Sequence, residues 1–208
     1  MKKRQFEALC KKLLLPHLPG FACKGWLMYA EPIGHVLRGF CCDDSGFDPH
    51  RFRLWVFFLP LYVPTVYVHF NMGEIIYEGS RRRDQWWTIN DPLLQSRLLA
   101  AIQENGLPFI QDVKAPLDVV RAISRLGNVS NPHRLEAIGY SLAMAGDVVR
   151  AWEALEHLKL LLDKASPWQA EMIQRAEVLE EKLRLDPQEA KHQLLEWERI
   201  SLKNLGLQ

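Results

Sequence analysis

Residues 39–50, GFCCDDSGFDPH, contain side chains of the types that bind metal ions: two cysteines, three aspartates and one histidine. At the end of a strand, adjacent side chains point to opposite faces, so Cys41 and Cys42 would point away from each other. Structural zinc sites instead pair cysteines about two to four residues apart and add a second pair elsewhere. Convergence of Cys41, Asp43 and His50 on one ion stays open as an alternative. We predict a strand end followed by a solvated loop, with no metal.

The same loop is a candidate protein-binding surface because it is acidic. Asp43, Asp44 and Asp48 lie among the turn-forming residues Ser, Gly and Pro. Complementary charge raises the association rate and the specificity of a protein complex. We therefore predict that these three aspartates contact a basic surface on a partner.

A second dense stretch, EGSRRRDQWWTIND, combines positive charge with aromatic rings at residues 78–91. Arg81, Arg82 and Arg83 with Trp86 and Trp87 combine cations with stacking surfaces, as nucleic-acid-binding proteins do. The same residue types dominate protein–protein hot spots. Alternatively, the tryptophans pack between a sheet and a helix. We predict all five as partner-binding residues and keep nucleic acid as an alternative ligand of Arg81–Arg83.

The sequence lacks the common motifs of catalytic sites. It contains no H-E-x-x-H, no G-x-S-x-G, no Walker-type phosphate loop and no G-x-G-x-x-G, and its seven histidines are scattered. No set of residues meets the requirement that a nucleophile, a base and an orienting group lie together. We predict a protein that is not an enzyme and uses no cofactor.

Composition is that of an ordinary globular protein. The 208 residues are 48% hydrophobic and 25% charged, with a formal net charge of +1. The most apolar stretch, residues 54–70, is shorter than the roughly 20 residues of a membrane helix and contains Pro60 and Pro64. The four cysteines do not have the spacing of a disulfide framework. We predict a cytoplasmic protein that does not bind membranes.

The elements that must position these residues divide the chain into two parts. An amphipathic helix near the N-terminus precedes strand patterns over residues 24–31 and 35–44, which we predict to pair as a hairpin. Further strand patterns cover residues 52–62, with a break or bulge at Pro60, residues 65–73, and as an optional fifth strand residues 74–79. From residue 91 onward, capping residues before prolines mark helix starts. These are Asp91-Pro92, Asn131-Pro132, Ser166-Pro167 and Asp186-Pro187, with capping-box spacing to Gln169 and Glu189 at the last two. We predict an α+β fold: an antiparallel sheet of four or five strands packed with helices in residues 1–128, then an all-helical bundle in residues 129–208.

One segment of the helical part resembles a helical hairpin of the tetratricopeptide type. In IGYSLAMAGDVVRAWEALEHLKLLL, Gly139, Gly146 and Ala151 occupy positions where two helices pack closely. We find no second copy, and such repeats need neighbours to form a solenoid. A plain helical bundle with one tight turn is the alternative.

The order of these pieces resembles the bacterial domain-of-unknown-function family 4304 over about residues 3–126. The resemblance lies in Gly20-Phe21 and Lys24-Gly25 at the first strand, Trp86-Trp87 before Ile89-Asn90-Asp91, and the Leu107-Pro108-Phe109 step. It implies a likeness to small α+β immunity and defence-associated proteins, which commonly bind and block a toxin. It implies no catalytic residue.

Three functions follow from these features. The first is a non-enzymatic protein-binding module of the immunity type, whose partner is a toxin or a subunit of a bacterial defence system. The second is a nucleic-acid-binding component of such a system, centred on Arg81–Arg83. The third is an adaptor whose C-terminal helices hold a protein partner.

Overall fold

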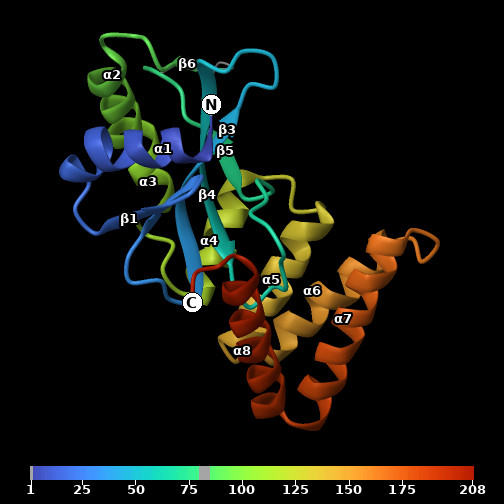
Figure 1. The fold of residues 1–208 in the computed structure, drawn as a ribbon. Coiled ribbons are helices and arrows are strands. Elements are labelled where there is room, and N and C mark those ends of the chain that lie inside the picture. The colour runs from blue at the N-terminus through green and yellow to red at the C-terminus, as the bar shows by residue number, and fades with distance from the viewer. Residues whose placement is uncertain (1, 80–84) are drawn as a thin grey trace. The chain divides into compact units, whose positions relative to one another are not determined.

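The computed structural model describes residues 2–79 and 85–208 and has an α+β fold, as predicted (Figure 1). The chain forms two compact units. We call Met1–Phe58 with Gly73–Val113 the first unit, and Leu59–Met72 with Lys114–Gln208 the helical unit. The domain boundary at residue 128 stays a prediction.

The first unit is built on an antiparallel sheet with the strand order β1-β2-β3-β4-β5, and a short β6 pairs with β4 beside this path. The predicted hairpin forms, since Met28 of β2 lies opposite Phe40 of β3. A further strand, β1, precedes it, because Gly25 at φ 64° turns the chain back on itself. The bounds are β1 Phe21–Lys24, β2 Leu27–Ala30, β3 Val36–Asp44, β4 Arg51–Pro60, β5 Gly73–Ile75 and β6 Trp87–Thr88.

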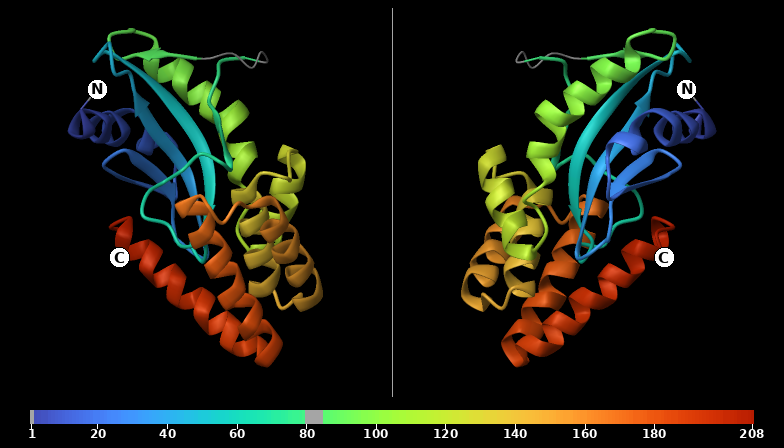
Figure 2. Two further views of the ribbon diagram at one scale, coloured as in Figure 1. Left: turned by 90° about the vertical axis from the view of Figure 1, so that its right-hand side faces the viewer. Right: turned by 90° about the vertical axis from the view of Figure 1, so that its left-hand side faces the viewer.

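The first unit buries one face of this sheet under helices from both ends of its sequence. The N-terminal helix α1 (Lys3–Leu9) continues into the short helices η1 (Cys10–Leu14) and η2 (Leu15–His17). The later segment, α2 (Leu94–Ala101), η3 (Ile102–Gly106) and α3 (Leu107–Ile110), runs alongside the long strands (Figure 2). Alternate strand residues supply the core, as a period of two requires. The shared cluster includes Phe6, Cys10, Phe40, Cys42, Phe52, Leu54, Trp87, Leu98 and Ile102.

The predicted strand over residues 65–73 is wrong, whereas the one over residues 74–79 forms in part as β5. Strand β4 ends at Pro60, as expected, but the chain from residue 61 to residue 72 is irregular. Its polar groups bond to the last helix instead of to a sheet: Thr65 N–H donates to Ser201 Oγ (3.2 Å), and Asn204 Nδ2 donates to the Thr65 carbonyl (3.0 Å). The strand propensity of this segment is therefore overridden by its tertiary contacts.

The helical unit contains the longer helices, whose starts follow the predicted capping signals only in part. Asn131 accepts from His133 N–H (3.0 Å) and Asp186 from Gln188 N–H (2.8 Å), both as caps. Ser166 makes no side-chain cap, and its capping box does not form because Gln169 accepts instead from Asp163 N–H (2.6 Å). The capping box of Asp186 with Glu189 does not form because Asp186 N–H donates to the Lys182 carbonyl (2.8 Å). The helices are α4 Pro116–Leu126, α5 Pro132–Met144, α6 Val148–Leu161, α7 Pro167–Leu185 and α8 Pro187–Asn204.

The predicted close packing of α5 and α6 is confirmed. A Cβ at Gly139 would lie 2.8 Å from a methyl carbon of Leu155 and 3.6 Å from the Ala151 carbonyl oxygen. Gly146 takes φ 84° in the turn between the helices, a conformation that favours glycine. None of the helices within the described ranges is both long and apolar enough to span a bilayer.

Candidate functional site

Helix α6 has apolar side chains on two faces, and only one face is covered. Ala151, Leu155 and Leu158 are buried. On the other side, Val149 is 70% exposed, Trp152 40% and Leu160 82%. These three residues recur at the three- and eight-residue spacings that keep side chains on one side of a helix. We call Val149, Trp152 and Leu160 the apolar stripe.

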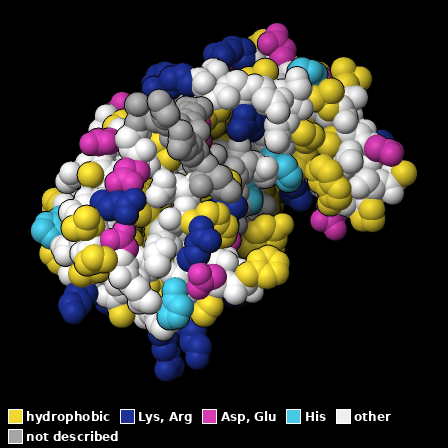
Figure 3. Space-filling model, turned by 90° about the horizontal axis from the view of Figure 1, so that it is seen from above, with side chains coloured by type: hydrophobic (Ala, Val, Ile, Leu, Met, Phe, Trp, Pro, Cys, Tyr) yellow, Lys and Arg dark blue, Asp and Glu magenta, His cyan; other side chains and the backbone are white. Residues whose placement is uncertain are grey.

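A groove of about 500 Å³ lies beside this stripe, between α6 and the C-terminal end of α7. Residues of both helices line it: Val148, Val149, Trp152, Glu153, Glu156, Leu183 and Arg184. Hydrophobic side chains reach the surface in several groups on the face drawn in Figure 3, so exposure alone does not mark a site. The groove differs because its exposed apolar side chains line a concave surface, as binding sites do.

Charged side chains lie in and around the groove, and some of them are already joined in ion pairs. Lys159 Nζ lies 2.6 Å from carboxylate oxygens of both Glu156 and Glu180, which joins α6 to α7 beyond the groove. Glu153 on α6 and Arg184 on α7 have no ion-pair partner within the part of the chain that the structure describes. The groove therefore presents an available carboxylate on one helix and an available guanidinium on the other.

A buried ion pair holds the inner side of the helical unit. The carboxylate of Glu136 on α5 accepts from Arg175 Nη2 (2.8 Å) and Nε (3.1 Å) on α7. Glu136 is almost fully buried, and this burial raises the pKa of its carboxyl while Arg175 opposes the rise. The pair fixes α7 against α5 and contributes to the scaffold that positions the groove.

The predicted acidic loop is only partly available for binding. Trp55 Nε1 donates to the Asp43 carboxylate (3.4 Å), and His50 N–H donates to Asp48 Oδ1 (2.8 Å). Asp44 is exposed, and Phe47, between the aspartates, is fully exposed. Asp43 and Asp48 thus stabilise the connection between β3 and β4, and their role in binding stays a prediction.

The two tryptophans of the stretch 78–91 lie in different environments. Trp87, in β6, is 2% exposed and belongs to the core of the first unit, so the packing alternative holds for this ring. Trp86 is half-buried, with the guanidinium carbons of Arg53 and Arg51 at 4.2 and 5.3 Å from its ring centroid. Arg81, Arg82 and Arg83 lie outside the described residues.

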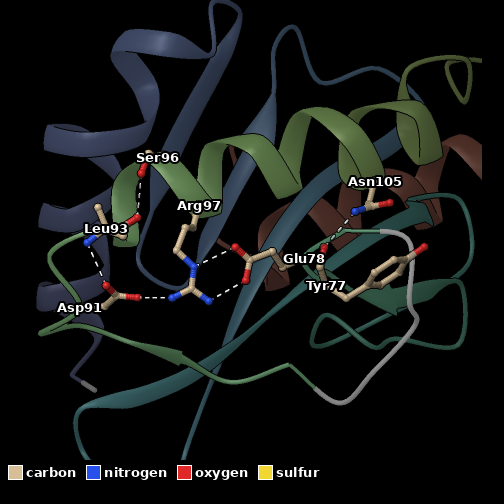
Figure 4. A network of polar contacts seen from close by, with 7 residues as sticks. All are labelled: Tyr77, Glu78, Asp91, Leu93, Ser96, Arg97 and Asn105. Carbon is tan, nitrogen blue, oxygen red and sulfur yellow. Dashed lines mark hydrogen bonds and ion pairs between the residues drawn. The ribbon is translucent and has the colours of Figure 1, made fainter.

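Arg97 forms ion pairs with residues at both ends of the stretch 78–91 (Figure 4). Arg97 on α2 donates to both carboxylate oxygens of Glu78 (2.8 and 2.6 Å) and to Asp91 (2.5 Å). Hydrogen bonding to Arg97 lowers the pKa of the Glu78 carboxyl. Asp91 also accepts from Leu93 N–H (2.9 Å), ahead of a helix that begins at Leu94. Asp91 therefore holds the loop that precedes α2, and the prediction that it caps the helix is wrong.

The two cysteines of β3 lie in different environments. Cys42 faces the core of the first unit with Phe40, whereas Cys41 lies outside that cluster, consistent with opposite faces of a strand. Burial raises the pKa of the Cys41 thiol to about 12. Across residues 2–79 and 85–208, no group of three or more His, Cys, Asp or Glu side chains is placed to hold a metal ion.

Sequence reasoning overlooked the groove, although a signal for it was present. Apolar residues of α6 occur around most of the helix, at Val148, Val149, Ala151, Trp152, Ala154, Leu155, Leu158, Leu160 and Leu161. A helix that packs on one side only needs a single apolar stripe. The excess of apolar residues indicates a second packing surface.

Searches of family models, curated proteins and solved structures found no match to the chain.

Proposed function

We propose that this chain is a non-enzymatic protein-binding module that holds its partner on the groove between α6 and α7. The observation that carries the proposal is the exposure of Trp152 and Val149 along a concave apolar surface. Tryptophan at the centre of an apolar patch is the residue type that most often dominates the affinity of protein complexes. This is the adaptor function expected from the helical part of the sequence.

The class of partner that we propose comes from the resemblance to family 4304, which remains a prediction. On that basis the partner is a bacterial toxin or a subunit of a defence system, and binding blocks or recruits it. In the first unit, we propose the acidic residues Asp44 and Asp48, together with the exposed Phe47, as a separate contact surface for a protein partner.

The test is co-purification of the tagged full chain from its native host, followed by variants of the groove. Trp152→Ala should abolish recovery of a stoichiometric protein partner. The matched control is Trp168→Ala, because Trp168 on α7 is 47% exposed and does not line the groove. Equal loss in both variants, or in neither, would contradict the proposed site.

A second candidate function is nucleic-acid binding by the first unit. The supporting observation is that Arg51 and Arg53 lie over Trp86, which adds two cations to Arg81–Arg83 of the same stretch. Binding of this kind weakens steeply with salt, because phosphate contacts release counterions. Fluorescence anisotropy with labelled single- and double-stranded DNA and RNA tests it. Absence of binding at low salt would eliminate this function.

A further inference from the structure

We propose that the α6–α7 groove binds an amphipathic helix of a protein partner, with a basic side chain facing Glu153 and an acidic side chain facing Arg184. This inference rests on the proposed function and specifies the chemistry of the partner. Helix-in-groove recognition places an apolar helix face in an apolar groove, with anchors at i, i+3, i+4 and i+7.

The dimensions of the surface suit a helix. The apolar stripe extends from Val149 to Leu160, which is about 16 Å, or three turns, along α6. A small molecule would fill the groove and leave Leu160 exposed, whereas a helix laid along α6 covers the whole stripe. The anchor side chains of such a helix would occupy the groove of about 500 Å³ beside Trp152.

The charges select the flanking residues of that helix. Glu156 is already paired with Lys159 at 2.6 Å, so it offers little to a partner. Glu153 and Arg184 line the groove on different helices, and neither forms an ion pair within the described ranges. An occupant with opposite charges on its two flanks satisfies both, whereas the reversed arrangement places like charges together.

A second copy of the chain fits this surface less well. In a two-fold symmetric dimer the same patch meets itself. Two grooves would then face each other, and only side chains of the stripe itself could enter the apolar volume beside Trp152. A convex occupant, such as a helix, removes that volume from water.

The test uses the full chain and a displayed library of helical peptides of about 18 residues, or five turns. One face carries fixed apolar residues at i, i+3, i+4, i+7 and i+11, and the flanking positions vary among Lys, Glu and Gln. We expect selected peptides to carry Lys on one flank and Glu on the other, with about tenfold tighter binding than their charge-swapped twins, from two partly exposed ion pairs. Isothermal titration calorimetry measures the difference.

A double charge reversal, Glu153→Lys with Arg184→Glu, should invert the preference for the two peptides. The matched control, Glu171→Lys with Lys191→Glu, reverses exposed charges that do not line the groove and should change nothing. Circular dichroism confirms that each variant folds. Retention of the original preference in the first variant would overturn the inference.

The outcomes separate this inference from the proposed function. Peptides that bind through Trp152 without any charge preference would overturn the partner chemistry and leave the protein-binding function intact. If no peptide binds in a Trp152-dependent way, the inference of a helical occupant fails, and the co-purification with Trp152→Ala decides the proposed function separately. A wild-type dimer in light scattering that becomes monomeric in Trp152→Ala would replace the partner helix with a second copy.

Discussion

Trp87 in β6 and Trp152 in α6 have opposite environments in the two units of the molecule. Trp87 is 2% exposed, and residues of α1, α2, β3 and β4 belong to the cluster that buries it. Trp152 is 40% exposed, because α5 and α7 cover two sides of α6 and leave the side with the apolar stripe open. The comparison shows that a tryptophan belongs to the core only where several elements converge on it.

The two rings therefore contribute to different equilibria. Removing the surface of Trp87 from water contributes about 25 cal/mol for each Å² of apolar area to folding. The exposed part of Trp152 contributes nothing to folding, and in the proposed complex it would gain the same kind of free energy. The following predictions are ordered by the size of the expected effect.

The largest effect is expected from Trp87→Ala, which should lower the free energy of unfolding by about 3–5 kcal/mol. The substitution leaves a cavity in the core shared by β4, α1 and α2. Urea denaturation followed by circular dichroism measures the change. Trp87→Phe is the control: it keeps an aromatic ring and removes an indole N–H without a hydrogen-bond partner among the described residues, so its loss should be much smaller. Equal losses would contradict the packing role.

A loss of about 3 kcal/mol is expected from Arg175→Met, because the variant leaves the buried Glu136 carboxylate unpaired. The double variant with Glu136→Gln should recover part of this loss, since the buried charge is then gone. Denaturation of the four proteins of this double-mutant cycle gives the coupling energy. Additive losses would show that the pair does not join α5 to α7.

Acidification should lower stability by about 2–3 kcal/mol through His69. Burial lowers the pKa of His69 to about 4, from the ordinary value of 6.5. The ring of His133, whose centroid lies 5.8 Å from that of His69, also disfavours the protonated form. Between these pH values the unfolded chain binds more protons, so stability is retained above pH 6.5 and lost as the pH falls toward 4. His69→Gln should flatten this part of the profile. Urea midpoints at pH 7.5 and 4.5 provide the measurement.

The smallest effect on stability is expected from Trp152→Ala, which should change the free energy of unfolding by no more than about 0.5–1 kcal/mol. Its ring is exposed and lines the groove instead of the core. Denaturation beside Trp87→Ala tests the comparison directly. A loss as large as that of Trp87→Ala would mean that Trp152 supports the fold and that the groove is not a binding surface.

Much of the fold could be predicted from local patterns. The hairpin of β2 and β3, the end of β4 at Pro60 and the close approach at Gly139 follow from alternation, proline chemistry and small-residue spacing. The irregular segment 61–72 could not be predicted, because Thr65 finds its partners on α8, far away in sequence. The capping boxes failed for a local reason: Gln169 accepts from Asp163 N–H, and Asp186 N–H donates to the Lys182 carbonyl.

The candidate site was harder to predict than the fold. Residue types in the stretch 78–91 indicated binding, yet Trp87 is part of a core. Conversely, the pattern around Trp152 indicated a packed hairpin, and the structure leaves that ring at the surface. Composition identifies side chains that gain free energy by leaving water, but it does not identify what covers them.

By itself, the sequence determined the α+β class, the main helices and strands, and the turn between α5 and α6, because periodicity, proline and glycine act within a few residues. Only the tertiary structure decided that Arg97 holds Glu78 and Asp91 together, that Trp87 is buried, and that α6 keeps an open apolar stripe. Burial depends on which distant segments meet at a residue, and no local pattern contains that information.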